Sequence, residues 1–180
     1  MQEESKEKGR KFPFKKLIIA IVIIILAGGI SFLAAWFLFP AYHMYGSSMY
    51  PALHQDEYVV CVKTGSVRQG DIIAFEYNNK VLIRRVIAVS GDVVDIREDG
   101  SVYINDSKLE EPYIRVFSVG NYTDVNFPCE VPDGCIFVLG DNRIESVDSR
   151  NSSIGFIEKS QIIGKLFLRI WPLSAFGGIK

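Results

Sequence analysis

Side chains that commonly bind transition metals are scarce in this 180-residue sequence, which has two histidines and three cysteines. A structural zinc site needs four such ligands, usually in closely spaced pairs. The five present here are scattered along the chain without that spacing. We therefore expect no bound metal, and the sequence indicates no other cofactor.

A surplus of positive charge, which is typical of nucleic-acid-binding proteins, is also missing. The sequence has 20 lysines and arginines against 21 aspartates and glutamates, which gives a net charge of −1 at pH 7. Residues 1–16 hold six of the basic residues beside three glutamates, so the rest of the chain is net acidic. This distribution argues against nucleic acid as a partner.

Charged residues are absent from Leu17–Phe39, a stretch of 23 residues. At 1.5 Å per residue it would form about 34 Å of helix, enough to cross a bilayer. A cleaved signal peptide has an apolar region of about 7–15 residues and a small-Xaa-small site, and neither is present. We predict a single-pass anchor at 17–39 in the cell membrane. Because no lysine or arginine follows it before Lys63, residues 1–16 should be cytoplasmic and residues 40–180 extracytoplasmic.

Helical periodicity is nearly absent after the anchor, where short β-branched runs alternate with turn residues. Asn78-Asn79 and Asp99-Gly100 each separate two such runs, which predicts two β-hairpins. The looser region from about 93 to 135 predicts a small β insert. The fold class is therefore mainly β behind an N-terminal transmembrane helix. Strands are expected at Tyr58–Lys63, Asp71–Tyr77, Val81–Val89, Val93–Arg97, Val102–Asn105, Ile136–Leu139 and Ile162–Ile170.

The cysteines leave one question open. Cys129 and Cys135 flank a short turn in the part predicted to lie outside the membrane, where the compartment can be oxidising. A disulfide between them and two free thiols are equally compatible with the sequence. Cys61 lies in an expected strand and is predicted to be a buried, small apolar residue.

A candidate nucleophile follows the anchor in Gly46–Leu53, the sequence Gly-Ser-Ser-Met-Tyr-Pro-Ala-Leu. Pro51 fixes its own φ and favours an extended conformation in the residue before it, which stiffens the backbone near Ser48. The Ser48 hydroxyl could therefore be held steady beside a membrane. The alternative is a tight turn that uses glycine and serine only for its backbone.

Two adjacent arginines lie in the expected strand Val81–Val89. Because strand side chains alternate, Arg84 and Arg85 project to opposite faces, each among apolar neighbours. A buried guanidinium needs a carboxylate partner, and Asp141 and Asp148 are candidates. The alternative is one exposed arginine and one that extends its charged head to water.

A dense run of polar residues, Gly140–Arg150, directly follows the strand that is expected to end at Leu139. Asp148 and Arg150 are two residues apart, so in an extended segment they would lie on one side and could pair. Ser146 could orient a neighbouring catalytic group. Taken alone, this run is typical of an ordinary polar loop.

Together these stretches resemble type I signal peptidases, the membrane-anchored serine endopeptidases that remove signal peptides from exported preproteins. The resemblance spans nearly the whole chain and implies the antiparallel β domain of the signal peptidase and LexA-like Ser-Lys proteases. The short middle region and the C-terminal Arg-Ile-Trp-Pro-Leu are similar to Gram-positive members. Four short sequence motifs, called boxes below, carry the resemblance, namely Gly46–Leu53, Gly70–Phe75, Ile83–Asp92 and Gly140–Arg150.

The resemblance implies that Ser48 is the nucleophile, that its backbone N–H donates to the oxyanion, and that Ser146 lies beside the catalytic base. The implied substrate is an extended signal peptide with small residues at the two positions that face shallow apolar pockets. Supporting positions in the boxes are Gly46, Met49 and Pro51, the pair Asp141 with Arg85, and the pair Asp148 with Arg150.

The base of this family is a lysine, and Arg84 stands at its position. A serine needs a positioned base to act as a nucleophile, and arginine, with a pKa above about 12, stays charged and cannot accept the proton. His43 and His54 are close to Ser48 in sequence and are alternative bases. Lys80 shares the strand face of Arg84 but lies about 13 Å along it, too far for the same role.

Two functions therefore remain open. A working signal peptidase accounts for the four boxes and for Ser48, but it requires a base. A catalytically impaired relative that binds preproteins or pilins and assists their assembly, alone or with secretion machinery, accounts for Arg84. A structural membrane-tethered β domain explains fewer of the boxes, and the anchor excludes a soluble self-cleaving repressor of the related Ser-Lys type.

Overall fold

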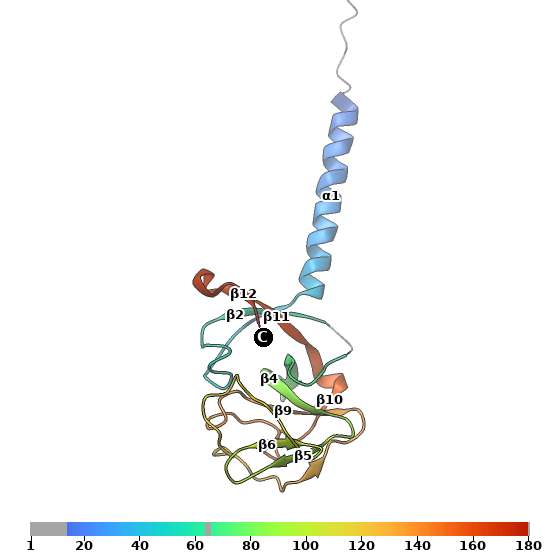
Figure 1. The fold of residues 1–180 in the computed structure, drawn as a ribbon. Coiled ribbons are helices and arrows are strands. Elements are labelled where there is room, and N and C mark those ends of the chain that lie inside the picture. Colours follow the sequence, from blue (N-terminus) through green and yellow to red (C-terminus); the bar gives the residue numbers. More distant parts are fainter. Residues whose placement is uncertain (1–13, 64–65, 180) are drawn as a thin grey trace, which may run out of the picture. The chain divides into compact units, whose positions relative to one another are not determined.

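The computed structural model describes residues 14–63 and 66–179, which fall into two compact units. The first unit is helix α1 (Phe14–Leu38), and the second is a β domain that begins at Phe39 (Figure 1). The fold class expected from the sequence is confirmed, since every element of the second unit is a strand, a turn or a short 3-10 helix.

Helix α1 is long and apolar enough to cross a membrane, and none of its 25 residues is buried. It begins three residues before the predicted span 17–39, because Lys15 and Lys16, which are good helix formers, continue it towards the N-terminus. The predicted cytoplasmic tail, residues 1–16, lies outside the described residues except for its last three positions.

The larger sheet of the β domain has eight strands, and every neighbouring pair runs antiparallel. Their order is β1-β2-β11-β3-β4-β9-β10, and β12 also pairs with β11. The bounds are β1 (Ala41–His43), β2 (Tyr58–Val62), β3 (Ile72–Tyr77), β4 (Lys80–Val89), β9 (Cys135–Leu139), β10 (Ile157–Glu158), β11 (Ile162–Trp171) and β12 (Gly177–Gly178), with 3-10 helices at Lys159–Gln161 and Leu173–Ala175.

A second, four-stranded antiparallel sheet lies in the region where the sequence predicts an insert. Side chains of the two sheets share one buried apolar cluster, in which Phe137 and Leu139 of the larger sheet pack with Val94 and Val102 of the smaller. The smaller sheet therefore packs against side chains of β9 through this shared cluster. Its order is β7-β6-β5-β8, with β5 (Val93–Ile96), β6 (Val102–Ile104), β7 (Ser107–Lys108) and β8 (Cys129–Glu130).

All seven predicted strands are present, each within one residue of its expected ends. The hairpin between β3 and β4 turns at Asn78 and Asn79, which both have positive φ, of 48° and 59°. Positive φ at both central residues matches the turn to the twist of the strands, which is why asparagine is favoured there. The five unpredicted strands are two or three residues long, too short to show an alternating pattern.

Strand β4 has different neighbours along its length. It pairs with β3 from Lys80 to Arg85, whereas β9 pairs with it only from Arg85 to Val89. Within the described residues, the edge of β4 on the β9 side is therefore unpaired from Lys80 to Arg84. This open edge has main-chain groups that β9 does not pair, and a second extended chain could bind there.

All three cysteines are free thiols in the structure. Cys61 is fully buried, as the sequence predicts, and burial raises the pKa of its thiol to about 11. Cys129 lies in the smaller sheet and Cys135 in the larger one. Of the two alternatives that the sequence left open, the structure therefore has the free thiols.

Candidate active site

Ser48 lies in a turn between β1 and β2 that is anchored by buried apolar side chains. Met49 and Leu53 are both fully buried, and the Leu53 N–H donates to the Met49 carbonyl at 2.9 Å. Gly46 adopts a φ of +75°, a conformation that favours glycine. The turn that sequence reasoning proposed as an alternative to a nucleophile is thus present, and it holds a half-buried Ser48 in place.

The loop Gly140–Arg150 fixes this turn from a second direction. The Asn142 N–H donates to the Ser48 carbonyl at 3.0 Å, and the Asn142 side chain donates to the Ser47 carbonyl at 3.3 Å. The Ser47 hydroxyl in turn donates to the Glu145 carboxylate at 2.5 Å. No role for Ser47 or Glu145 was predictable from local sequence, because only the fold brings these segments together.

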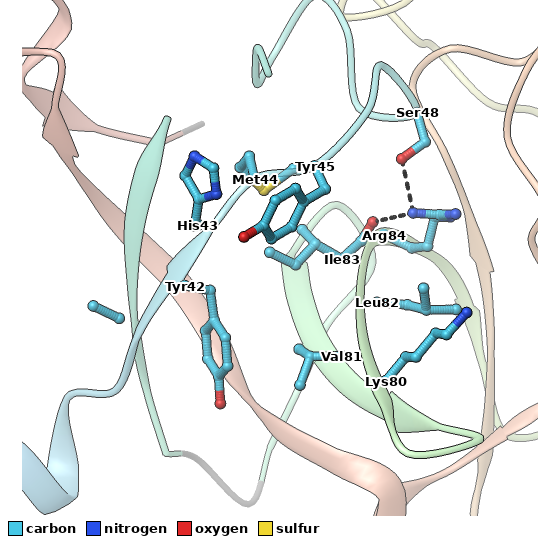
Figure 2. A pocket seen from close by; sticks show the side chains of 11 residues that line it. Tyr42, His43, Met44, Tyr45, Ser48, Lys80, Val81, Leu82, Ile83 and Arg84 are labelled. Atoms are coloured by element: carbon cyan, nitrogen blue, oxygen red, sulfur yellow. Dashed lines mark hydrogen bonds between the residues drawn. The ribbon is translucent and has the colours of Figure 1, made fainter. Parts of the chain in front are cut away.

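Arg84 contacts the candidate nucleophile directly. Its Nη1 lies 2.9 Å from the Ser48 Oγ, and the same nitrogen donates to the Ile83 carbonyl at 2.6 Å (Figure 2). Nε and Nη2 both donate to the Val147 carbonyl, at 3.2 and 2.8 Å. The side chain is only 7% exposed, so the guanidinium is held in one orientation towards Ser48.

The charge of Arg84 has no ion-pair partner: no carboxylate among the described residues lies within 4.0 Å of it. Sequence reasoning expected a carboxylate, and this expectation was wrong, because carbonyl and hydroxyl oxygens satisfy the guanidinium instead. Burial lowers the pKa of Arg84, the charge of Asp148 opposes that shift, and Arg150 adds to it. An arginine still remains protonated in a protein, so Arg84 can donate to Ser48 but cannot take its proton.

Ser146 does not contact Arg84 through a hydrogen bond. Its hydroxyl is buried and has no hydrogen-bond partner among the described residues, although the next residue, Val147, accepts two bonds from Arg84. A buried hydroxyl without a partner is costly to the stability of the fold. Gly140 allows Ser146 to lie close to residues 46–53, the turn that holds the candidate nucleophile Ser48 and is called the nucleophile turn below. A Cβ at Gly140 would lie 2.2 Å from the Ser146 Oγ and 2.6 Å from the Ser48 carbonyl oxygen.

Buried ion pairs surround the serine. Arg85 donates to both carboxylate oxygens of Asp141, at 2.8 and 2.7 Å, and to the Gly70 carbonyl at 2.9 Å. Burial raises the pKa of Asp141, and the hydrogen bonds and charge of Arg85 oppose that shift. Both side chains are at most 3% exposed, so the pair ties β4 firmly to the start of the Gly140–Arg150 loop.

A second pair joins Arg150 to Asp148 through two bonds of 2.8 Å, and Asp148 also accepts the Gly140 N–H at 2.9 Å. A third pair, between Arg143 and Glu111, is fully buried and was missed by sequence reasoning. Glu111 comes from the insert, and its position next to Pro112 gave no sign of a distant partner.

The two histidines that were considered as alternative bases have other partners. His43 Nε2 lies 3.3 Å from an Asp56 carboxylate oxygen, and His54 Nδ1 lies 3.4 Å from Glu57. The Ser48 hydroxyl is hydrogen-bonded to Arg84 instead. Neither histidine therefore occupies the place of a base in this structure.

An apolar cleft of about 500 Å³ opens beside Ser48. One wall is formed by Ala41–Tyr45, which includes strand β1, and the other by Lys80–Arg84 of β4 (Figure 2). The second wall is the same stretch of β4 whose edge is unpaired. Serine, arginine and an open strand edge thus meet in one cleft.

We predict that Asp141→Asn destabilises the β domain by about 3 kcal/mol, because it leaves the buried Arg85 charge without its carboxylate. The matched control is Asp95→Asn, which removes an exposed pair with Arg97 at 3.8 Å and should cost less than about 1 kcal/mol. Urea unfolding of both variants in detergent measures the difference. Equal losses would show that the buried pair has no special role.

We further predict that Gly140→Ala lowers stability by about 1–3 kcal/mol, since the new methyl group would overlap the Ser48 carbonyl and the Ser146 side chain. Gly178→Ala is the control, because its nearest neighbour would be 3.9 Å away. Thermal unfolding of the two variants should differ clearly. Unchanged stability of Gly140→Ala would mean that the loop shifts freely away from the nucleophile turn.

Known proteins similar to this chain point to one family. A family model described as signal peptidase, peptidase S26, matches residues 15–171. A signal peptidase I from Bacillus caldolyticus is 34% identical over 191 residues, covering 98% of each chain. A signal peptidase IB from Staphylococcus aureus is 35% identical over 181 residues, covering 90% of this chain and 93% of the relative.

A crystal structure of a signal peptidase I from Enterococcus faecalis V583 aligns with a TM-score of 0.47 at 34% identity, covering 56% of this chain and 96% of that one. The family match includes the nucleophile turn, strand β4 and the Gly140–Arg150 loop, and the two relatives align over at least 90% of the chain. The chain belongs to the signal peptidase family, peptidase S26.

Proposed function

We propose that this chain is a membrane-bound serine endopeptidase that acts on the signal peptides of exported preproteins, with Ser48 as its nucleophile. The observation that carries the proposal is the position of Ser48 beside an apolar cleft whose wall is an unpaired strand edge. An extended peptide can pair with such an edge through its backbone, while every second side chain faces the cleft. Small side chains would fit shallow apolar pockets there.

The membrane part of the proposal rests on α1. A helix of this length would hold the β domain at the bilayer surface, where an exported preprotein presents its signal peptide. The basic residues that precede the helix support a cytoplasmic N-terminus and an extracytoplasmic β domain. The cleft would then meet its substrates after they have crossed the membrane.

The chemistry depends on residue 84. Peptide hydrolysis by Ser48 requires a base that takes the hydroxyl proton, and loss of such a base slows a reaction by about 10²–10⁴-fold. We assign Arg84 to the base position and Ser146 to the group that orients the base. The Ser146 hydroxyl is buried and has no hydrogen-bond partner within the described part of the chain, which supports this assignment, because an ammonium or amine at position 84 could use it as a hydrogen-bond partner.

A second candidate function is binding of signal peptides without cleavage. The observation that favours it is the hydrogen bond from Arg84 to the Ser48 Oγ. The hydroxyl oxygen there accepts a hydrogen bond from a charged guanidinium, whereas hydrolysis would require a base at that place. The cleft and its open edge serve this function equally well. The two candidates differ only in the fate of the bound peptide.

We predict that the purified full chain in detergent cleaves a model preprotein slowly and that Arg84→Lys cleaves it about 10²-fold faster or more, because buried lysine can lose its proton. Ser48→Ala should abolish cleavage in both backgrounds. Arg97→Lys, an exposed change of the same kind on the insert, is the matched control and should leave the rate unchanged. Product formation on gels, confirmed by N-terminal sequencing of the product, measures cleavage by all five proteins.

Cleavage that survives Ser48→Ala would exclude Ser48 as the nucleophile. A parent chain that is silent while Arg84→Lys cleaves would favour the second candidate, binding without hydrolysis. A failure of Arg84→Lys to gain activity would contradict the assignment of position 84 to the base.

A further inference from the structure

Arg84 differs electrostatically from the other buried arginines of the β domain. Arg85, Arg143 and Arg150 each bind a carboxylate within an ion pair. Among the residues that the structure describes, Arg84 alone of these four has no carboxylate within 4.0 Å. Its acceptors are uncharged, namely two carbonyl oxygens and the Ser48 hydroxyl. Arg84 is therefore buried without a carboxylate in direct contact, and the charge of Asp148, which acts on it from farther away, is already paired with Arg150.

Such a charge favours an anion at the same place. Leaving a buried cation without an opposite charge is costly, and a charge-assisted hydrogen bond to a carboxylate is about twice as strong as a neutral one. The described residues accept four of the five N–H groups of Arg84, so one remains for a ligand, and the bond to Ser48 can be exchanged for another. Arg84 also lines the cleft together with Ser48, so a ligand in the cleft can reach it.

The walls of the cleft indicate the kind of anion. Besides the cation Lys80, the lining includes the apolar side chains of Met44, Leu82 and Ile83, which can pack against an organic ligand but not against a small inorganic ion. The unpaired edge of β4 ends at Arg84, so an extended peptide paired with that edge would bring its backbone to the guanidinium. The one carboxylate that every peptide carries on its backbone is at its C-terminus.

We propose that the cleft selectively binds peptides through their free C-terminal carboxylate, which Arg84 receives beside Ser48. The ligand class is an apolar peptide with small residues near its C-terminus, the chemistry of the signal-peptide half that cleavage releases. This inference rests on the proposed function, because it uses the same cleft. Because of Arg84, the chain then has a higher affinity for the cleaved peptide than for the uncut preprotein.

The test compares two synthetic peptides that differ only at the C-terminus. A fluorescent apolar peptide ending in small residues is prepared as the free acid and as the C-terminal amide, and its binding to the full chain in detergent is followed by anisotropy. The acid should bind about tenfold more tightly than the amide or better, as expected for a charged hydrogen bond. This comparison needs only the parent protein, so it does not depend on any variant folding.

Two variants test whether Arg84 is the residue responsible for the preference for the acid over the amide. Arg84→Gln should reduce the acid-to-amide ratio to about one, with the amide affinity little changed. Lys80→Gln is the matched control, because Lys80 is an exposed cation that lines the same cleft, and it should keep the tenfold ratio. Loss of the preference in Lys80→Gln with retention in Arg84→Gln would overturn the assignment to Arg84.

The outcomes separate this inference from the proposed function. Equal binding of acid and amide, both displaced by an uncut signal peptide, would overturn carboxylate recognition and leave the proposed function standing. If the acid, the amide and the uncut signal peptide all fail to bind, both the inference and the proposed function are overturned. A tenfold preference that disappears in Arg84→Gln supports the inference whether or not the chain cleaves preproteins.

Discussion

The need of buried guanidinium groups for partners determines how this domain is built around its serine. A buried arginine without acceptors would cost several kcal/mol, so each one requires oxygen atoms at fixed positions. The Gly140–Arg150 loop supplies several of these oxygens: Asp141 binds Arg85, and the Val147 carbonyl binds Arg84. Because both arginines belong to β4, the loop is locked to that strand. The arginines that impose these constraints are Arg84, Arg85, Arg143 and Arg150.

The position of Ser48 follows from the position of that loop. Asn142 holds the nucleophile turn through the Ser48 and Ser47 carbonyls, and Gly140 allows the two segments to approach more closely than a side chain would permit. On the other side, buried Met49 anchors the turn in the core. The serine is therefore fixed by residues about a hundred positions away in the sequence, and the cleft beside it stays open because β9 leaves the first half of β4 unpaired.

Local patterns made much of this structure predictable. The period of two and the Asn78-Asn79 turn identify β3 and β4, and the apolar, uncharged run identifies α1. The same alternation placed Arg84 and Arg85 on opposite faces. It could not show that Arg84 lacks a carboxylate, because that depends on which distant segments pack against each face. The Glu111–Arg143 pair could not be predicted for the same reason, since its two residues are 32 positions apart. Glu111 lies in the loop between β7 and β8 of the smaller sheet, and Arg143 lies in the loop between β9 and β10 of the larger sheet.

Under the proposed function, Arg84 is assigned to the position of a lysine base, and burial has different consequences for these two side chains. Burial lowers the pKa of both side chains, and for lysine this brings the neutral amine within reach near neutral pH. Arginine begins above about 12, so the same burial leaves it a donor. Its forked side chain donates twice to the Val147 carbonyl, while the Ser146 hydroxyl has no hydrogen-bond partner among the described residues. Under the proposed assignment, Arg84 thus places a fixed cation beside Ser48, where hydrolysis would need a proton acceptor.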